Sequence, residues 1–328
     1  MRTLVMSEPA PGPERTAVQD VPEPRPGNGQ VTIEVAHAGV NFLDVMARRG
    51  DPGYAPSWPY TPGFEVAGRV RETGPGVTGL APGQRVAAFT RGGGFADIAV
   101  AEAGSVVPLP DPVLTEVAAA APLMLSTALL LLTDVTRVHE GDVVLMHSVG
   151  GGVGSAVAQL VPVLGGSLRI GTVGRPEKVS EAVTAGWDLV LPRTETTPGK
   201  VRAAAGRGID VVLDPLGTSM VEFDLEVAAP GARIALFGNP SGGAPSPLPP
   251  LGRLIGGNVA LAGFSMSRLT AAAPHRAADA LRQVLELLAD RRLTPTVTVL
   301  TRLEDVPNAH QLLAEGRGVG KYVAAVAA

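Results

Sequence analysis

The chain has 328 residues, of which 45% are hydrophobic and 18% charged, with a formal net charge of −4 and no cysteine. This length and composition allow two ordinary globular domains with large buried cores. The absence of cysteine excludes disulfides, thiolate nucleophiles and cysteine-ligated metals, and we expect a cytoplasmic protein. The acidic balance and the scattered Lys and Arg residues argue against a nucleic-acid partner.

The N-terminal third shows the pattern of a β-rich region. Alternating or apolar runs such as MRTLVM, VTIEVAHAGV and QRVAAFT are separated by Pro and Gly clusters as far as Pro110, which favours short strands joined by turns. The most apolar stretch, Ala118–Leu132, contains Pro122 and is shorter than the roughly 20 residues of a membrane span. We therefore expect a buried helix there and no membrane partner.

From about Thr115 the pattern changes to helix-length segments between short apolar runs. The apolar runs are DVVLMHSV, LRIGTVG, DLVLP, IDVVLDPLG, ARIALFG and NVALAGF. Such alternation predicts a parallel sheet covered by helices on both faces, with GSAVAQLVPVLG and RPEKVSEAVTAG among the helices. The tail, with the helical HRAADALRQVLELLADRR and the apolar TPTVTVLTRL and GKYVAAV, resembles the first region, and Pro240–Gly252 is predicted to form a loop.

The turn after the first of these runs, HSVGGGVGSA at His147–Ala156, fits the dinucleotide fingerprint G-x-G-x-x-G in two registers. Its three positions are either Gly150, Gly152 and Ser155 or Val149, Gly151 and Gly154. The fingerprint needs a close backbone approach to the pyrophosphate and then a close contact between helix and strand. A helix that begins at about Gly152 meets both needs in the second register, which leaves Gly150 as an extra flexible residue.

This turn, VLMHSVGGGVGSAVAQL, resembles that of the zinc-independent quinone oxidoreductases and enoyl reductases of the medium-chain dehydrogenase/reductase superfamily. Further motifs of that branch occur in the family's order along the chain: AGVNFLDVMARRG, PGFEVAGRV, GGGFADIAV, DVVLDPLG, FGNPSG and GKYVAAV. The resemblance implies an α/β fold with two domains. A GroES-like β-rich catalytic domain is expected at residues 1–117 and 267–328, and a Rossmann domain, a doubly wound parallel sheet that binds NADPH, at residues 118–266.

The residues after LRIGTV bear on the choice of cofactor. An enzyme that uses NAD usually carries Asp or Glu about 20 residues after the glycines, against the ribose 2′-hydroxyl, whereas this chain has GRPEK. Gly174 leaves space there, and Arg175 and Lys178 bring cations suited to a 2′-phosphate, unless both are solvated charges at a helix start. The sequence therefore predicts NADPH, with Arg193 stacking on the adenine end or helping to hold the 2′-phosphate.

The predicted cofactor site combines these residues with others that the resemblance implies. Asn41 is expected beside the nicotinamide and Thr127 near its amide. Phe237 to Asn239 follow a strand at its carboxyl end, where open α/β sheets bind ligands. The full predicted set is Asn41, Thr127, Gly151, Gly152, Val153, Gly154, Gly174, Arg175, Lys178, Arg193, Phe237, Gly238 and Asn239.

The resemblance also bears on metal binding. Zinc-dependent relatives hold their catalytic metal with Cys and His at the places occupied here by Asn41 and Phe64. Asn is a poor zinc ligand and Phe is none, so we predict no zinc and no other metal site. His147 is expected to cap or hydrogen-bond near the glycine turn, and Asp44 in GVNFLD to have a structural role.

Without a Lewis acid, alcohol oxidation is disfavoured. The remaining chemistry is hydride delivery from NADPH to a quinone or to the β-carbon of an α,β-unsaturated carbonyl, where the charge spreads over a conjugated system. Asn41 and Tyr54 are the candidate catalytic residues. The resemblance implies that Tyr54 donates a proton or binds the carbonyl, and the alternative is a loop aromatic without that role.

Two other functions stay open at this point. An enoyl reductase of a polyketide or other secondary-metabolite pathway would act on an enoyl thioester, and an NADPH-binding protein with little catalysis would keep only the cofactor site. The last apolar run, NVALAGFSM at Asn258–Met266, is expected to form a sheet edge that pairs with a second copy in a homodimer.

Overall fold

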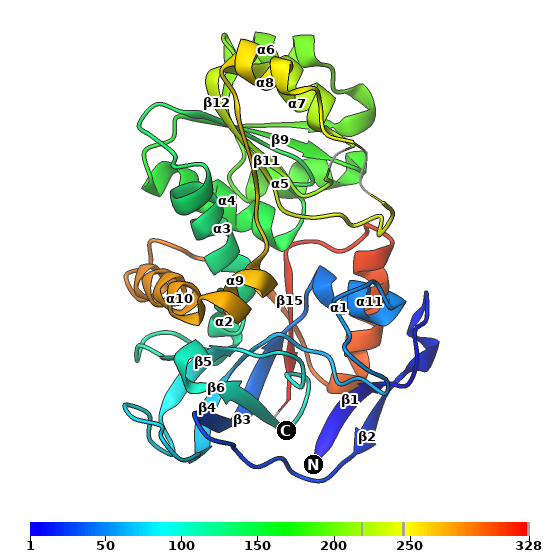
Figure 1. Cartoon of the computed structure of the whole chain (residues 1–328), viewed down its shortest axis with the longest axis vertical. Helices are drawn as coiled ribbons and strands as arrows, with labels where there is room; N and C mark the ends of the chain where they lie inside the picture. The colour runs from blue at the N-terminus through cyan, green and yellow to red at the C-terminus, as the bar shows by residue number, and fades with distance from the viewer. Residues whose placement is uncertain (218, 245–246, 327–328) are drawn as a thin grey trace. The chain divides into compact units, whose positions relative to one another are not determined.

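The computed structural model describes residues 1–217, 219–244 and 247–326, which form two compact units (Figure 1). The β-rich unit contains Met1–Ser126 and the chain from Met266 onward, and the Rossmann unit contains Thr127–Ser265. The predicted domain boundaries lay at 117/118 and 266/267. The first boundary of the compact units falls later because the helical segment that follows Thr115 packs on strands of the β-rich unit.

The β-rich unit is built on a mixed seven-stranded sheet of order β14-β15-β3-β4-β5-β7, with β6 also paired to β3. A separate ladder joins β1 to β2. The strands are β1 (Arg2–Met6), β2 (Thr16–Asp20), β3 (Gln30–Gly39), β4 (Glu65–Thr73), β5 (Arg85–Phe89), β6 (Ile98–Glu102), β7 (Val106–Pro108), β14 (Val297–Leu300) and β15 (Lys321–Ala325). The helices are α1 (Phe42–Arg49), α2 (Thr115–Ala118), α9 (Met266–Ala272), α10 (Pro274–Ala289) and α11 (Val306–Ala314).

The two ends of the chain meet in this sheet. The C-terminal strand β15, red in Figure 1, pairs antiparallel with β3, so that Ala324 lies opposite Ala38. β3 is the central strand, and its Val31, Ile33 and Val35 are buried in the main apolar cluster of the unit. The pairing brings Lys321, the first residue of β15, close to the loop that follows β3.

The Rossmann unit has a six-stranded parallel sheet of order β10-β9-β8-β11-β12-β13. In chain order this is 3-2-1-4-5-6, the order of doubly wound dinucleotide-binding sheets. The strands are β8 (Val143–Met146), β9 (Leu168–Val173), β10 (Leu189–Pro192), β11 (Ile209–Asp214), β12 (Ala228–Leu236) and β13 (Ala260–Gly263). The connecting helices are α4 (Gly152–Val163), α5 (Val179–Thr184), α6 (Pro198–Ala205), α7 (Val221–Val227) and α8 (Leu251–Gly257). Each of the six predicted apolar runs forms one of these strands, and the predicted fold class is confirmed.

The stretch Ala118–Leu132 is helical and mostly buried, as predicted, but it is irregular. Two π-helical turns, Ala121–Leu125 and Leu131–Val135, flank the short helix α3 (Ser126–Leu130). Pro122 lies in the first of these turns, where its missing N–H would leave a gap in a regular helix. Over residues 1–217, 219–244 and 247–326, no helix combines the length and the apolarity that a bilayer crossing requires.

Several helices were not predicted, among them α1, α9, α8 and α11. α8 begins at Leu251, inside the expected loop Pro240–Gly252, of which Pro245 and Ser246 lie outside the described residues. Its sequence LGRLIGG contains three glycines and its side chains Leu251 and Ile255 are exposed, so no apolar stripe marks it as a helix. α11 was missed as well, within a stretch that carries Pro near its first turn.

Candidate functional site

The glycine turn joins β8 to α4 at the carboxyl end of the parallel sheet. The helix begins at Gly152, as expected, and Gly151 is its N-cap. A Cβ on Gly154 would lie 2.3 Å from the carbonyl oxygen of Val149, so this close helix contact requires glycine. A Cβ on Gly151 would meet nothing nearer than 3.8 Å, which leaves space above its backbone. This geometry fits the register with Gly151 and Gly154.

The first turn of α4 has the properties of an anion site. The amides of Gly152, Val153 and Gly154 have no acceptor within the helix, because the first N–H groups of any α-helix lack an i−4 carbonyl. Such amides and the positive end of the helix dipole together favour a phosphate group. The N-terminus of α4 therefore offers the predicted place for the pyrophosphate.

Gly150 lies next to a side chain that the sequence did not place there. It was interpreted as an extra flexible residue, but a Cβ there would come within 3.0 Å of the Cδ atom of Lys178. The aliphatic stem of Lys178 therefore lies over the turn, and burial lowers the pKa of its ammonium. The strained position of the turn is Ser148, whose φ is 57°.

A second cation reaches the same turn from the end of β10. Arg193 donates from Nη2 to the Ser148 hydroxyl at 2.8 Å, and its Nη2 lies 3.6 Å from where a Cβ of Gly174 would be. Arg175 stands next to Gly174, with its Nη1 3.6 Å from Glu177 Oε1 and its side chain 45% exposed. The structure thus brings Lys178, Arg193 and Gly174 together at the glycine turn.

The residues after β12 also lie at the carboxyl end of the sheet, yet two of them have evident structural roles. A Cβ on Gly238 would lie 2.3 Å from the carbonyl oxygen of Pro215, so this close packing by itself requires glycine. Asn239 bonds within its own loop, donating to the Gly243 carbonyl at 2.7 Å and accepting from the Ser241 hydroxyl at 2.9 Å. Phe237 and Thr127 are half-buried, Thr127 at the start of the Rossmann unit.

A buried titratable cluster that the sequence did not reveal lies below the turn. His147 is fully buried, with Nδ1 2.9 Å from the Thr172 hydroxyl and Nε2 2.8 Å from Asp224 Oδ1, which confirms that it forms hydrogen bonds near the turn. Burial and the nearby Asp224 raise the pKa of Asp214 to about 7. The Oδ2 atoms of both carboxyls have no partner among the described residues. The only signal was an Asp at the end of the apolar run IDVVLD.

In the β-rich unit, Asn41 precedes α1, and its side-chain amide forms three hydrogen bonds. Its Nδ2 donates to Glu65 Oε1 at 2.8 Å and to the Gly39 carbonyl at 3.2 Å. Its Oδ1 accepts from Lys321 Nζ at 2.7 Å, and Lys321 also forms an ion pair with Glu65. Glu65 and Lys321 were missed as site residues, although each is the lone charge at the start of an apolar motif, EVAG or KYVAAV.

Asp44 has the structural role that was expected. Its carboxylate accepts the backbone N–H of Asn41 at 2.8 Å and that of Gly63 at 3.1 Å, and so ties the start of α1 to the loop before β4. Burial, opposed by these hydrogen bonds and by the charge of Lys321, raises the pKa of Asp44 to about 7.

Tyr54 lies half-buried in the loop after α1. It packs with Trp58 and Phe64 against an apolar cluster that contains Met6 and Tyr60. Burial, and next the charge of Asp51, raises the pKa of Tyr54, so the phenol keeps its proton. Its hydroxyl has no hydrogen-bond partner within the part of the chain that the structure describes. Tyr54 can therefore donate a hydrogen bond to a ligand.

Phe64 stands at the position of the metal-binding His of zinc-dependent relatives, and it packs against the apolar cluster that contains Met6 and Tyr60. The amide of Asn41, at the position of their Cys, is engaged with Glu65 and Lys321. Within the described ranges, no three His, Asp or Glu side chains are grouped so as to hold a metal ion.

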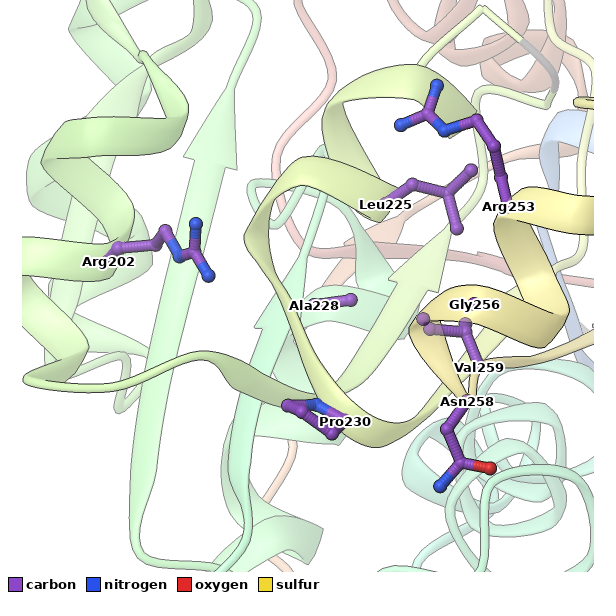
Figure 2. A pocket seen from close by; sticks show the side chains of 9 residues that line it. Arg202, Leu225, Ala228, Pro230, Arg253, Gly256, Asn258 and Val259 are labelled. Carbon is purple, nitrogen blue, oxygen red and sulfur yellow. The ribbon is translucent and has the colours of Figure 1, made fainter.

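One cavity of about 370 Å³ lies elsewhere in the Rossmann unit. Figure 2 shows Arg202 of α6 and Arg253 of α8 on two sides of it, with Ala228 and Pro230 between them. Ala228 and Pro230 belong to the amino-terminal half of β12, whereas ligands of open α/β sheets bind at the carboxyl ends of strands. This cavity is therefore separate from the predicted cofactor residues.

Comparison with known proteins agrees with this architecture. Residues 27–111 match the alcohol dehydrogenase GroES-like domain family, and residues 185–323 match the zinc-binding dehydrogenase family. The pig quinone oxidoreductase is 31% identical over 317 residues, which cover 95% of this chain and 94% of that protein. The human synaptic vesicle membrane protein VAT-1 homolog-like is 31% identical over 321 residues, 92% of this chain and 75% of that protein.

Two further matches bear on activity. A segment of the spectinabilin polyketide synthase system protein NorB of Streptomyces orinoci is 32% identical over 304 residues, 90% of this chain and 13% of that protein. The solved structure of Escherichia coli quinone oxidoreductase complexed with NADPH is 25% identical, with a TM-score of 0.89 over 99% of this chain and 100% of that chain. The chain therefore belongs to the quinone oxidoreductase branch of the medium-chain dehydrogenase/reductase superfamily, and it is an oxidoreductase by descent.

Proposed function

We propose that the protein is an NADPH-dependent, zinc-independent reductase of quinones or α,β-unsaturated carbonyls. The observation that carries the proposal is the pair of cations, Lys178 and Arg193, that meet at the glycine turn. The NADPH complex of the E. coli relative supports the same cofactor.

The residues of the Rossmann unit fit the phosphates of this cofactor. The first-turn amides at Gly152–Gly154 would hold the pyrophosphate, and Arg175, Lys178 and Arg193 would hold the 2′-phosphate by charge-assisted hydrogen bonds. An NAD enzyme would instead present a carboxylate at Gly174. When bound, the nicotinamide supplies the hydride.

The residues also support reduction without zinc. Although one matched family is described as a zinc-binding dehydrogenase, Phe64 offers no ligand atom, and the amide of Asn41 is already bonded to Glu65 and Lys321. A conjugated acceptor needs no Lewis acid, because a hydrogen bond to its oxygen can stabilise the developing charge.

We assign that hydrogen bond to Tyr54. Its phenol keeps its proton, because burial raises its pKa, and it packs against the same apolar cluster as the aromatic side chains of Trp58 and Phe64. Such surfaces suit a flat, apolar ring and exclude water, which strengthens a hydrogen bond to the carbonyl oxygen. In this proposal the β-rich unit orients the acceptor and shields it from water.

The alternative acceptor is an enoyl thioester, and the similarity to a segment of NorB supports it. A simple assay separates the candidates: NADPH oxidation by the purified protein with benzoquinone, methyl vinyl ketone and a crotonyl thioester. We expect turnover with the first two and a clear preference for NADPH over NADH. If the protein binds NADPH but oxidises it with none of the three, the non-catalytic function replaces this proposal.

We further propose a cytoplasmic homodimer that pairs through β13. This strand ends the parallel sheet, with Ala260 and Gly263 exposed, and the preceding helix α8 exposes Leu251 and Ile255 at 68% and 70%. An unpaired sheet edge beside exposed apolar side chains is a surface that proteins normally cover.

A further inference from the structure

The amide of Asn41 is held in one orientation by two charged side chains from distant parts of the chain. Lys321, from β15, and Glu65, from β4, are 3% and 0% exposed. Glu65 Oε2 accepts the N–H of Leu123 at 2.7 Å, and a Cβ on Gly39 would lie 2.2 Å from Glu65 Oε1. Gly39 thus makes room for the carboxylate, which the backbone fixes from the other side.

The chemistry of these neighbours decides which atom of the amide faces which partner. An ammonium can only donate hydrogen bonds and a carboxylate can only accept them. The atom that faces Lys321 at 2.7 Å must therefore be Oδ1, and the atom that faces Glu65 at 2.8 Å must be Nδ2. In the reverse orientation, the Nδ2 donor would face the Lys321 ammonium, which is also a donor. The Oδ1 acceptor would face the Glu65 carboxylate, which is also an acceptor.

Every hydrogen of the group is used. Lys321 donates to the Val40 carbonyl at 2.9 Å, to Asn41 Oδ1 and to Glu65 Oε1, which accounts for the three donors of an ammonium. The two Nδ2 hydrogens of Asn41 go to Glu65 and to the Gly39 carbonyl. Asn41 Oδ1 accepts from Lys321 and also faces the N–H of Asp44 in a capping box, but that N–H donates to the Asn41 carbonyl at 3.1 Å. One lone pair of Asn41 Oδ1 therefore stays open to a ligand.

We infer that Lys321 and Glu65 are positioning residues that make Asn41 a hydrogen-bond acceptor toward its ligand. The ligand group must then carry a hydrogen. This inference rests on the proposed function, since NADPH offers ribose hydroxyls and a carboxamide, whereas the carbonyl oxygen of a quinone or enone has no hydrogen to give. Asn41 thus binds the cofactor, and the substrate carbonyl takes its donor elsewhere.

The first test needs no cofactor. In the protein without ligand, the side-chain amide hydrogens of Asn41, assigned by their loss in Asn41→Asp, should exchange slowly with solvent in NMR spectra. In Lys321→Met, which removes the ammonium, their exchange should become fast. Fast exchange in the unsubstituted protein would overturn the inference, whether or not the enzyme uses NADPH.

The second test is a double-substitution cycle on the Kd of NADPH, measured by fluorescence. We expect Asn41→Ala and Lys321→Met each to weaken binding about tenfold, as for one lost hydrogen bond, and the double variant to be no weaker than Asn41→Ala. KM for benzoquinone should stay unchanged. Effects that multiply in the double variant, or a raised KM with an unchanged Kd, would contradict the inference.

Lys321→Met leaves Glu65 buried and unpaired, so it can fail to fold. The variant Lys321→Met/Glu65→Gln removes both charges and should fold while binding NADPH as weakly as Asn41→Ala. The exposed Lys200→Met is the control for loss of a positive charge. If the unsubstituted protein binds no NADPH although the Asn41 amide is protected, the proposed function and the acceptor role both fail, and the orientation of the amide stands.

Discussion

The side chain of Lys178 crosses Gly150, where a Cβ would come within 3.0 Å of its Cδ atom. The stem of Lys178 thereby lies at the turn that Arg193 also reaches, through its bond to the Ser148 hydroxyl. A glycine in the middle of the turn therefore has a packing role, which is to let a cation lie close to the proposed phosphate site.

This contact leads to a prediction for Lys178→Met, which keeps the packing stem and removes the charge. Binding of NADPH should weaken roughly tenfold or more, because a charge-assisted hydrogen bond contributes about 1.5–3 kcal/mol. Binding of NADH, which lacks the 2′-phosphate, should change little. The ratio of the two dissociation constants measures the effect, with the exposed Lys200→Met as control. An unchanged ratio would remove Lys178 from the phosphate site.

Arg175 gives a second, independent prediction. Its side chain is 45% exposed and its Nη1 lies 3.6 Å from Glu177 Oε1, so we expect its replacement to cost little stability. Arg175→Gln should weaken NADPH about tenfold and leave NADH and the melting temperature unchanged. Arg202→Gln, at the other end of the sheet, is the matched control. Equal losses for both cofactors would show that Arg175 does not read the 2′-phosphate.

The Rossmann unit could be predicted from the sequence because each of its elements is marked by residues that are adjacent in the chain. Each strand is a short apolar run, and the turn after β8 carries its glycines in a fixed spacing. The contact of Asn41 with Lys321 could not be predicted in this way, because it joins residues 280 positions apart through the pairing of β3 with β15. No periodicity in the sequence indicates which two charged residues will share a buried site. The contact of the Lys178 stem with Gly150 could not be predicted for the same reason.

The two fingerprint glycines should respond differently to alanine. At Gly154 the added Cβ would lie 2.3 Å from the Val149 carbonyl oxygen, and the overlap should cost about 1–3 kcal/mol in the free energy of unfolding. At Gly151 the nearest atom is 3.8 Å away and the backbone is extended, so Gly151→Ala should fold normally. Its methyl group should instead obstruct the dinucleotide and raise the Kd. Denaturation and NADPH titration of both variants check this, and stability losses of equal size would refute the assigned register.

The pKa of Asp214, raised to about 7, gives a prediction for stability against pH. Between the ordinary pKa of Asp, near 4, and about 7, the folded carboxyl holds a proton that the unfolded one has lost. The contribution of Asp214 to stability is therefore present at low pH and is lost as pH rises through 7. Asp214→Asn keeps an oxygen for the N–H of Leu216, which Oδ1 accepts at 2.7 Å, and removes the repulsion with Asp224.

We therefore expect Asp214→Asn to be more stable than the unsubstituted protein at pH 8 and to lose this advantage toward pH 4, a window that follows from the raised pKa of Asp214. The comparison of the two proteins is essential, since His310, whose pKa burial lowers to about 3, changes stability in the opposite direction. Urea denaturation across this range measures the difference. The exposed Asp20→Asn should show none, and an advantage that grows toward low pH would contradict the assignment.

The edge of the parallel sheet allows a sharp test of the proposed homodimer. Phe264 donates its N–H to Leu236 of β12 at 2.9 Å, and donors alternate along a strand, so the N–H of Gly263 points to the open edge and that of Ala262 points to β12. Gly263→Pro should thus convert a dimer into a monomer in sedimentation velocity. The melting temperature of this monomer should stay close to that of the unsubstituted protein diluted until it is monomeric. Ala262→Pro, which removes an inward bond, should instead destabilise the sheet by about 1–3 kcal/mol, because the acceptor on β12 loses its partner. A dimer that persists in Gly263→Pro would exclude pairing through β13.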